Sequence, residues 1–565
     1  MKNARLVLIL FLFLIFGAAI TGRLFYLQIL NHKFYQSLAL GQQAGFSEVL
    51  GRRGQIYFQN SQDSKGASGS EDIKNLAINR DVWTLSVICE NILNKKEFAN
   101  KVGEIIGEKS DVLFSLVNSR QGYAIIKKNL TDDEISKLKK INLKGISLQS
   151  TVARSYPQND FAAHVIGFIN GDGVGQYGIE GYYNDILSGR SGIKEQKKGL
   201  GTIGQDDQTN LDGSDLYLTI DYNIQFQAES LLRQAKKDID IDSGQIIVLK
   251  PDSGRILAMA NFPSFDLNQY GKEKDVAIFQ NTCVQKIFEP GSVEKPFTMS
   301  AAINEGKITP DTTYTDYGFL KIGPATIHNF DKKTYGKQTM TGVLEKSINT
   351  GAVFAEKSLE AKVYLDYLDR FAFNQKTGID LQGESYSQNN ILKQGREINL
   401  ATSSFGQGIE MTPIQLAVAF SAIANGGKMI KPYILDRIVN GKDEKKTVPV
   451  ALSQVFSEQT ASQVTTMLMS VVERGFGKSA KVPGYYLAGK TGTAEVPIKG
   501  GAGYYSDRTI QSFIGFGPAL SPQFLILVKL DNPKVSASSL SAAPIFHNLA
   551  KYILNYWQIP PDYTK

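Results

Sequence analysis

Hydrophobic and polar positions divide the chain into stretches of different periodicity. An almost continuous apolar run extends from Leu6 to Ile20, and a further apolar turn follows it. Between residues 40 and 205, short strand-like pieces such as Trp83–Ile88 are mixed with charged stretches of helical spacing. Two polar segments, 60–72 and 194–213, hold too few apolar residues to be assigned regular structure, and the pattern changes after the second one.

The segment after residue 213 has the pattern of an α+β domain. A helical pattern around Ile224–Lys237 leads into two apolar strand-like runs, Gln245–Leu249 and Arg255–Ala260, which a Pro-Asp-Ser-Gly turn joins. Long helical stretches follow, and the C-terminal part contains three strand patterns and an apolar helix: Tyr485–Val496, Gln511–Phe516, Phe524–Leu530 and Leu540–Tyr556. Strands gathered at both ends of a helical middle favour an antiparallel sheet packed with helices.

The N-terminal pattern predicts a membrane anchor. Lys2 and Arg5 precede the apolar run, so the positive end should stay in the cytoplasm and the rest of the chain should be exported. The run from Leu6 to Ile20 spans about 22 Å as a helix, which reaches across a membrane core only if the next turn contributes. A cleaved signal peptide is the alternative, because residues 17–19 loosely satisfy a small-x-small cleavage site.

These patterns predict three regions. We expect a cytoplasmic tip and transmembrane anchor at residues 1–30, an extended pedestal domain at 31–205 and a larger domain at 213–557.

The amino-acid composition mainly excludes classes of function. The 565 residues include 62 Lys and Arg against 55 Asp and Glu, a net charge of +7, and no basic block resembles a nucleic-acid arm, so we expect no nucleic-acid partner. The two cysteines, Cys89 and Cys283, fall in different predicted domains, which argues against a disulfide framework. The histidines lack the spacing of metal ligands, so no metal or cofactor is expected: His32, His164, His328 and His547.

A serine activated by a lysine is the simplest catalytic arrangement that remains. Ser-x-x-Lys on a helix puts both side chains on one face, so an unprotonated lysine could accept the hydroxyl proton. The motif begins at Ser136, Ser191 and Ser292, and only the last starts an apolar helix after a Pro-Gly break. Pro296 falls in the first helical turn, where its missing N–H costs nothing. The helix start would point backbone donors at a developing oxyanion.

Ser347-Ile348-Asn349 fits the same chemistry. It offers a hydroxyl for proton relay and an amide for a peptide substrate, within the helix-compatible segment Thr341–Phe354. Another Ser-x-Asn, at Ser387–Asn389, lies in a polar loop and is less suitable.

Lys490-Thr491-Gly492-Thr493 is the third element. It follows the strand pattern Tyr485–Ala488 and provides positive charge, hydroxyls for a substrate carboxylate and a glycine that lets a backbone approach a ligand closely. The similar Lys376-Thr377-Gly378 ends a helical run, where its glycine is most simply interpreted as a cap.

In this order, Ser292-x-x-Lys295, Ser347-x-Asn349 and Lys490-Thr491-Gly492 resemble the three active-site motifs of the penicillin-binding serine transferases. Other stretches resemble the division-type class B penicillin-binding proteins: Phe405–Ile409, Thr412–Leu416 and Val482–Tyr485. Three N-terminal stretches resemble the pedestal motifs of that family: Arg53–Ile56, Arg154–Pro157 and Gly178–Gly181. The resemblance covers nearly the whole chain and implies the α+β penicillin-binding serine transferase fold, an N-terminal pedestal and one N-terminal transmembrane helix.

The resemblance implies a peptidoglycan D,D-transpeptidase that cross-links stem peptides during septal cell-wall synthesis through a serine acyl-enzyme. Ser292 would attack the carbonyl between the two terminal D-alanines, and Lys295 would be the general base. Ser347 would carry the proton to the departing D-alanine. β-Lactams would be trapped as mimics of the D-Ala-D-Ala end.

The same resemblance implies the substrate-binding residues. Asn349 would hold the amide of the donor stem, and Lys490 would supply a positive field and help to hold the Ser347 hydroxyl. Thr491 and Thr493 would bind the terminal carboxylate, with Gly492 between them, and the backbone N–H groups of Ser292 and Thr493 would form the oxyanion hole.

The chain departs from the family pattern at two places. Val293-Glu294 stands where uncharged residues are usual, and a carboxylate facing the site would raise the pKa of Lys295, although adjacent helical residues diverge. Tyr57–Asn60 stands where the pedestal commonly has Asp-Arg-Asn-Gly.

The same motifs also fit four other functions. They are an elongation-type transpeptidase, a D,D-carboxypeptidase, a β-lactamase and a non-catalytic division scaffold. The resemblance implies as partners stem peptides ending in D-Ala-D-Ala, β-lactams, the membrane, a polytopic membrane glycosyltransferase and other division proteins. It also implies a single-pass protein of the cytoplasmic (inner) membrane, with the catalytic domain on the extracytoplasmic side.

Overall fold

The computed structural model describes residues 14, 16–17, 20–22, 24–26, 47–58, 74–120, 122–141, 143–194, 211–498 and 503–563. Contacts group the chain into two compact units, Met1–Gly54 with Ser188–Ser214 and Gln55–Leu187 with Asp215–Lys565. The first unit contains an antiparallel ribbon of β1 (Ser47–Leu50) and β8 (Ser191–Lys194). The other strands and helices described below belong to the second unit.

Most of the predicted anchor at residues 1–30 lies outside the described residues, as do the polar run 60–72 and most of the run 194–213. In the part of the chain that the structure describes, no helix has both the length and the apolar character needed to cross a membrane. The transmembrane helix therefore stays a prediction.

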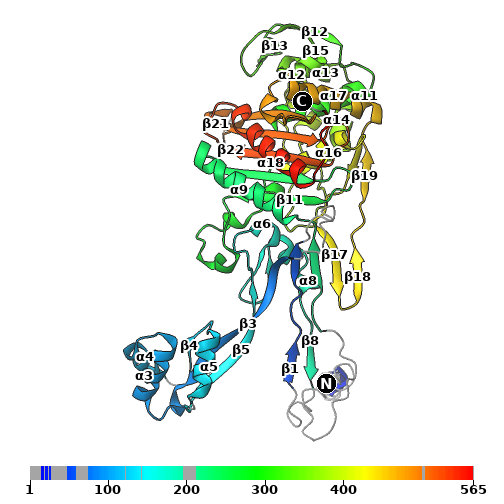
Figure 1. The fold of residues 1–565 in the computed structure, drawn as a ribbon. Coiled ribbons are helices and arrows are strands. Elements are labelled where there is room, and N and C mark those ends of the chain that lie inside the picture. Colours follow the sequence, from blue (N-terminus) through cyan, green and yellow to red (C-terminus); the bar gives the residue numbers. More distant parts are fainter. Residues whose placement is uncertain are drawn as a thin grey trace, which may run out of the picture. The chain divides into compact units, whose positions relative to one another are not determined.

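A five-stranded antiparallel sheet lies at the centre of the C-terminal part of the second unit (Figure 1). Its strands lie in the spatial order β11 (Ile256–Phe262), β10 (Ser243–Leu249), β22 (Phe524–Asp531), β21 (Tyr504–Gly517) and β20 (Ala488–Pro497). β10 and β11 form the predicted hairpin, and β10 also pairs with β22 from the other end of the domain. The predicted antiparallel sheet is confirmed, with β20 at one edge.

Helices cover both faces of this sheet. Alternate residues of β22 point to opposite sides: Phe524, Ile526, Val528 and Leu530 pack in one cluster with α9 (Tyr222–Ile239) and α18 (Ala542–Tyr556). Leu525 and Leu527 instead join the cluster of α11 (Lys295–Asn304) and α16 (Pro413–Ala424). Because both faces are buried, β10, β11 and β22 have nearly continuous apolar sequences.

Helices and short hairpins fill the middle of the domain. The helices are α10 (Thr282–Gln285), α12 (Met340–Glu345), α13 (Asn349–Lys357), α14 (Ala361–Arg370), α15 (Glu397–Ser403) and α17 (Glu458–Glu473). The antiparallel pairs are β12 (Thr313–Asp316) with β15 (Gly336–Thr339), β13 (Phe319–Ile322) with β14 (Ala325–His328), and β16 (Lys428–Ile430) with β19 (Ala451–Gln454). The sequence pattern did not predict these pairs, because strands of three or four residues have too short a period to recognise.

A second, seven-stranded sheet combines N-terminal and C-terminal segments. Its order is β18 (Asp443–Lys446), β17 (Leu435–Asn440), β9 (Asp215–Leu218), β2 (Ile56–Phe58), β3 (Lys74–Ile88) and β4 (Tyr123–Lys127), and β5 (Ile146–Ser155) also pairs with β3. The strand predicted at Trp83–Ile88 is the end of β3. Three helices share a core with β3 and β4: α3 (Lys95–Ile106), α4 (Ser110–Ser119) and α5 (Asp132–Lys140).

Two of the predicted pedestal motifs meet in a buried ion pair. Arg154 at the end of β5 donates from Nε to Glu180 Oε1 at 2.7 Å, and their side chains are 1% and 0% exposed. Glu180 lies on the short helix α7 (Gly178–Tyr182), beside α8 (Asn184–Leu187). The Tyr156 hydroxyl accepts the Ile169 N–H at 3.0 Å and lies 3.4 Å from Glu180. The ion pair therefore joins β5 to α7.

Further bonds join this region to the segments around the large sheet. The Tyr183 hydroxyl donates to Asp380 at 3.0 Å, and the Asp380 carboxylate also accepts the N–H groups of Ile434 and Leu435, each at 2.7 Å. The Ala162 N–H donates to Glu229 on α9 at 2.7 Å.

We predict that Glu180→Ala lowers the free energy of unfolding by about 3–5 kcal/mol, because it leaves a buried guanidinium without its carboxylate. The matched control is Lys137→Ala, which removes an ion pair on α5 whose side chains are 55% and 71% exposed and should change stability by less than about 1 kcal/mol. Urea unfolding of both variants measures the difference. Equal effects would contradict the prediction.

Candidate active site

Ser292 lies in a tight turn that leads directly into a helix. The 3₁₀ turn η5 (Gly291–Glu294) is followed without a break by α11, and Pro296 occupies the first turn of that helix as predicted. Gly291 has φ +62°, and an added Cβ would lie 2.8 Å from the Thr493 carbonyl oxygen on β20. Glycine therefore lets the turn approach the edge strand of the sheet.

Lys295 is fully buried and contacts both predicted catalytic serines. Its Nζ lies 3.0 Å from Ser292 Oγ and 3.1 Å from Ser347 Oγ, and it donates to the Ser347 carbonyl oxygen at 2.5 Å. Burial, and next the nearby charge of Lys490, hold the pKa of Lys295 well below its usual value of 10.5. A neutral amine at this position can accept a hydroxyl proton.

Ser347 stands between two helices rather than inside one. It connects α12 to α13 with φ +55°, a left-handed conformation that is strained for serine. The predicted helix-compatible segment Thr341–Phe354 is thus interrupted at the motif. The interruption places the Ser347 hydroxyl between two lysines, since Lys490 Nζ donates to it at 2.9 Å.

Lys490 and the residues after it lie on the edge strand β20. Lys490 is fully buried, and burial lowers its pKa to about 7. Its Nζ also donates to the Thr491 carbonyl oxygen at 3.0 Å, and Thr493 Oγ1 lies 3.4 Å from Ser538 Oγ. A Cβ on Gly492 would lie 2.3 Å from Ser512 Oγ and 2.9 Å from Val293 Cγ1, so this glycine permits η5 to pack on β20. Because η5 (Gly291–Glu294) carries the predicted nucleophile Ser292, we call it the nucleophile turn. The close approach of a ligand to the Gly492 backbone, which the sequence suggested, stays a prediction.

Asn349 is the first residue of α13. Its Nδ2 donates to the His328 carbonyl oxygen at 2.9 Å, and its backbone N–H donates to Asn329 Oδ1 at 3.1 Å. The structure thus brings Ser292, Lys295, Ser347 and Lys490 into one network, and holds Asn349 two residues from Ser347 against the hairpin β13–β14.

Glu294, the unusual residue between nucleophile and lysine, is fully buried, and neither of its carboxyl oxygens has a hydrogen-bond partner among the described residues. Burial raises its pKa well above the usual value, which favours the protonated, uncharged form of the side chain. It lies near Tyr364 on α14, a buried tyrosine whose pKa is raised by burial in the first place. A neutral Glu294 adds no negative charge beside Lys295.

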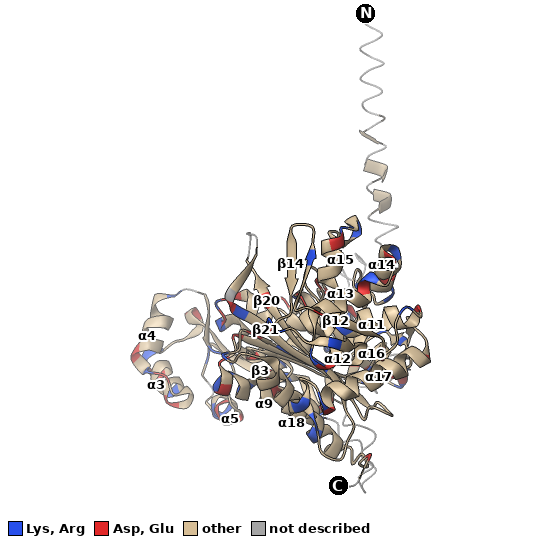
Figure 2. Ribbon diagram, turned by 90° about the horizontal axis from the view of Figure 1, so that it is seen from above, with Lys and Arg blue, Asp and Glu red and all other residues tan. Residues whose placement is uncertain are grey.

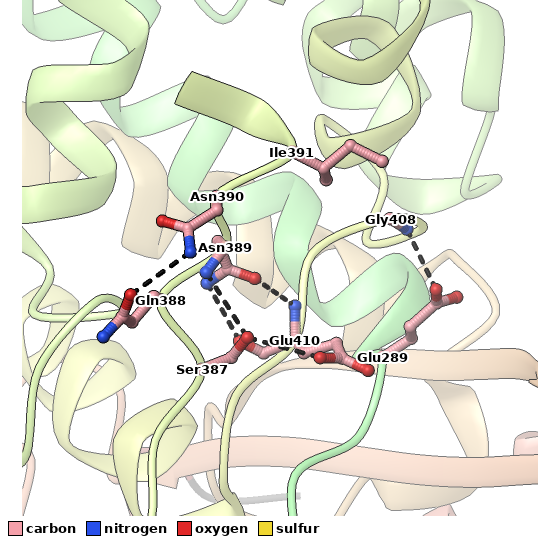
Figure 3. Close-up of a pocket in the computed structure, with 8 residues that line it drawn as sticks. All are labelled: Glu289, Ser387, Gln388, Asn389, Asn390, Ile391, Gly408 and Glu410. Carbon is pink, nitrogen blue, oxygen red and sulfur yellow. Dashed lines mark hydrogen bonds between the residues drawn. The ribbon is translucent and has the colours of Figure 1, made fainter. Parts of the chain in front are cut away.

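A surface pocket of about 340 Å³ lies beside the segment that leads into the nucleophile turn (Figure 3). It is lined by Glu289, Ser387, Gln388, Asn389, Asn390, Ile391, Gly408 and Glu410. The alternative Ser-x-Asn motif at Ser387–Asn389 therefore lies here, and none of the predicted catalytic or substrate-binding residues lines this pocket.

Glu289 is a residue that the sequence analysis did not single out. Its carboxylate accepts the Gly408 N–H at 3.1 Å and the Tyr504 hydroxyl at 3.1 Å, and the Gly291 N–H donates to the Gly406 carbonyl oxygen at 3.1 Å. These bonds hold the family-like stretch Phe405–Ile409 against the nucleophile turn. The sequence feature that could have identified Glu289 is its position three residues before Ser292, at the Pro-Gly break.

The remaining sequence candidates lie elsewhere. Ser136 is on α5 and Ser191 on β8. The predicted cap at Gly378 is wrong, because α14 ends at Arg370 and Gly378 lies in the following loop with φ +76°. The described residues include no group of three or more histidine, cysteine, aspartate or glutamate side chains arranged to hold a metal ion.

Comparison with known proteins identifies the family. Residues 244–551 match the penicillin binding protein transpeptidase domain, and residues 49–218 match the penicillin-binding protein dimerisation domain. The chain belongs to the class B penicillin-binding proteins. The predicted family is confirmed, and with it the transpeptidase fold of the C-terminal part.

Relatives of this class B protein agree over most of its length. Stage V sporulation protein D of Bacillus subtilis is 32% identical over 490 residues, which are 84% of this chain and 76% of that protein. The probable peptidoglycan D,D-transpeptidase PbpC of Pseudomonas aeruginosa is 30% identical over 574 residues, 99% of this chain and 96% of the relative. A crystal structure of penicillin binding protein 3 from Mycobacterium tuberculosis, complexed with aztreonam, has a TM-score of 0.70 and 28% identity, and the match covers 92% of this chain and 98% of that one.

We predict that Lys490→Met stabilises the protein at neutral pH and that its advantage shrinks as the pH rises. The pKa of Lys490 is about 7 in the folded protein and 10.5 in the unfolded chain. Between pH 7 and 10.5 the unfolded chain therefore binds more protons at this residue than the folded protein does. The stability of the wild type accordingly rises with pH across this window. The gain at pH 7 should be about 3–5 kcal/mol, less the loss of hydrogen bonds.

Unfolding of both proteins at several pH values between 7 and 10 measures this difference. A difference that is independent of pH would contradict the lowered pKa of Lys490.

Proposed function

We propose that this class B penicillin-binding protein is a peptidoglycan D,D-transpeptidase that cross-links stem peptides during septal wall synthesis. One observation carries the proposal: the buried Lys295 amine, with its lowered pKa, lies 3.0 Å from the Ser292 hydroxyl and 3.1 Å from that of Ser347. The matched transpeptidase domain and the relative named as a probable peptidoglycan D,D-transpeptidase support it.

Acylation follows from this arrangement. Ser292 Oγ attacks the carbonyl carbon between the two terminal D-alanines while Lys295 Nζ accepts the hydroxyl proton. The backbone N–H groups of Ser292 and Thr493 stabilise the oxyanion of the tetrahedral intermediate. Ser347, hydrogen-bonded to both lysines, passes a proton to the nitrogen of the departing D-alanine, and an ester on Ser292 remains.

Deacylation completes the cross-link. The amine of a second stem peptide attacks the ester carbonyl, the new amide bond forms and Ser292 recovers its proton. A β-lactam opens its ring on Ser292 in the same way and remains attached; the aztreonam complex of the mycobacterial relative supports this expectation.

Substrate binding uses the residues around this centre. Asn349 holds the amide of the donor stem, and Lys490 provides the positive field beside Ser347. Thr491 and Thr493 bind the terminal carboxylate along the edge strand β20, where Gly492 separates them. No cofactor enters the proposed chemistry.

The location and domain division belong to the same proposal. The N-terminal residues 1–30 form the single anchor in the cytoplasmic (inner) membrane, residues 31–205 the pedestal and residues 213–557 the extracytoplasmic catalytic domain. A polytopic membrane glycosyltransferase supplies the glycan strand, in contact with the anchor and pedestal, among other division proteins.

We predict a lasting benzylpenicillin adduct on the detergent-purified protein and none on Ser292→Ala, read by intact-protein mass spectrometry over time. Ser136→Ala is the matched control, because its serine begins the same Ser-x-x-Lys pattern on α5, and it should form the adduct normally. An adduct that decays within seconds would favour a β-lactamase. No adduct on the wild type would favour a non-catalytic scaffold.

We predict that depletion of the protein in its host blocks septation, so that cells elongate without dividing. Microscopy of cells during depletion measures this outcome, with re-expression of the wild type as the control. Loss of rod shape with continued division would instead identify an elongation-type transpeptidase.

A further inference from the structure

Four aromatic side chains are exposed on and beside the hairpin β13–β14. Tyr317 is 70% exposed, Phe319 48% and Phe330 57%, and His328 is exposed as well. Phe319 and His328 are paired across the hairpin with ring centroids 6.2 Å apart. The Asn329 N–H donates to the Gly318 carbonyl oxygen at 3.3 Å, so the pairing continues toward Tyr317 and Phe330.

The opposite face of the hairpin is already packed. Ile322 and Ile327 are buried in a small cluster with Ala352 and Val353 of α13, and Leu320 packs against it. The aromatic face therefore points away from the domain, and Figure 2 shows the hairpin that carries β14 at the outer edge of the domain, between β20 and α15. Exposed apolar groups gathered in this way mark a binding surface.

The hairpin that carries this aromatic face is hydrogen-bonded to the candidate active site. The His328 carbonyl oxygen accepts the Asn349 amide N–H at 2.9 Å, and Phe330 is two residues further, at most about 7 Å of chain. A stem peptide extends about 3.5 Å per residue, so the sugar that carries the stem lies within about 15 Å of the reacting carbonyl. The hairpin is hydrogen-bonded to Asn349, which is two residues from Ser347 in the lysine–serine network.

The chemistry of the face suits a carbohydrate. A pyranose ring has an apolar C–H face that stacks on an aromatic ring and a rim of hydroxyls that needs hydrogen-bonding partners. Lys321 and Thr326 are paired across the hairpin and are both exposed, so they can meet such a rim. Each partner in a stable protein complex buries roughly 800 Å² of surface. A hairpin with strands of four residues offers a small surface in comparison, which suits a sugar better than a protein partner.

We propose that the aromatic face formed by Tyr317, Phe319, His328 and Phe330 binds the glycan of the donor strand and so presents its stem peptide to Ser292. The inference rests on the proposed function. It gives the hairpin a role that no small substrate or β-lactam requires, because these molecules carry no sugar.

The test compares a double variant, Phe319→Ala with Phe330→Ala, with the wild type as full chains in detergent. Phe226→Ala is the matched control: this ring is 49% exposed on α9, which packs on β11 at the sheet edge opposite β20. Uncross-linked glycan strands with pentapeptide stems, made by a separate glycosyltransferase, are one substrate, and benzylpenicillin is the other. We expect the double variant to lose about tenfold in cross-linking while its rate of acylation by benzylpenicillin stays within about twofold.

Three results would overturn the inference. An equal loss with benzylpenicillin would mean that the hairpin only shapes the active site, and unchanged cross-linking of strands would mean that it binds no glycan. A defect confined to cells, with full activity of the purified double variant, would mean that the face binds a partner protein.

A second measurement separates this inference from the proposed function. Co-sedimentation with glycan strands whose stems an amidase has removed should retain the wild type and Phe226→Ala but not the double variant. If benzylpenicillin forms no adduct with the wild type, the proposed function fails, and this co-sedimentation still decides glycan binding.

Discussion

The rest of the site depends on one constraint: two lysine amines are buried away from water, and both lie beside the same hydroxyl. Lys295 and Lys490 are fully buried, and both contact the hydroxyl of Ser347. Burial of an ammonium group is costly, so each amine gives up its proton more readily, and a neutral amine is what a general base needs. The stability lost in this way is the usual trade between folding and catalysis. Water must be kept out for the effect to persist.

Close packing of distant segments keeps that water out. Gly291 and Gly492 let the nucleophile turn and β20 approach each other, and the Glu289 carboxylate ties the same turn to Gly408 and Tyr504. The left-handed conformation at Ser347 is strained, and it is held because both neighbouring helices are packed. The site is therefore a property of the whole domain, since its parts come from a turn, a helix break and a sheet edge.

The sequence predicted the chemistry better than the local geometry. The order of Ser292, Ser347 and Lys490 motifs, the antiparallel sheet and the helix starting after Ser292 could be predicted, because motif spacing and apolar runs are local signals. The helix break at Ser347 could not, because the flanking residues favour a helix and only tertiary packing imposes the positive φ. The short hairpin β13–β14 and the bonds of Glu289 were also missed, since both depend on contacts between segments far apart in the chain. The burial of Glu294 as a neutral acid has no local signal either.

The proposed mechanism requires that burial keeps Lys295 neutral beside Ser292. The most direct measurement is an NMR titration of the lysine side-chain nitrogens in the full chain, with Lys295→Met to assign the resonance of Lys295. We expect this amine to be deprotonated already at a pH where exposed lysines are still charged. A Lys295 resonance that titrates together with the exposed lysines would contradict the proposed role of Lys295 as the base, and the proton from Ser292 would then need another acceptor.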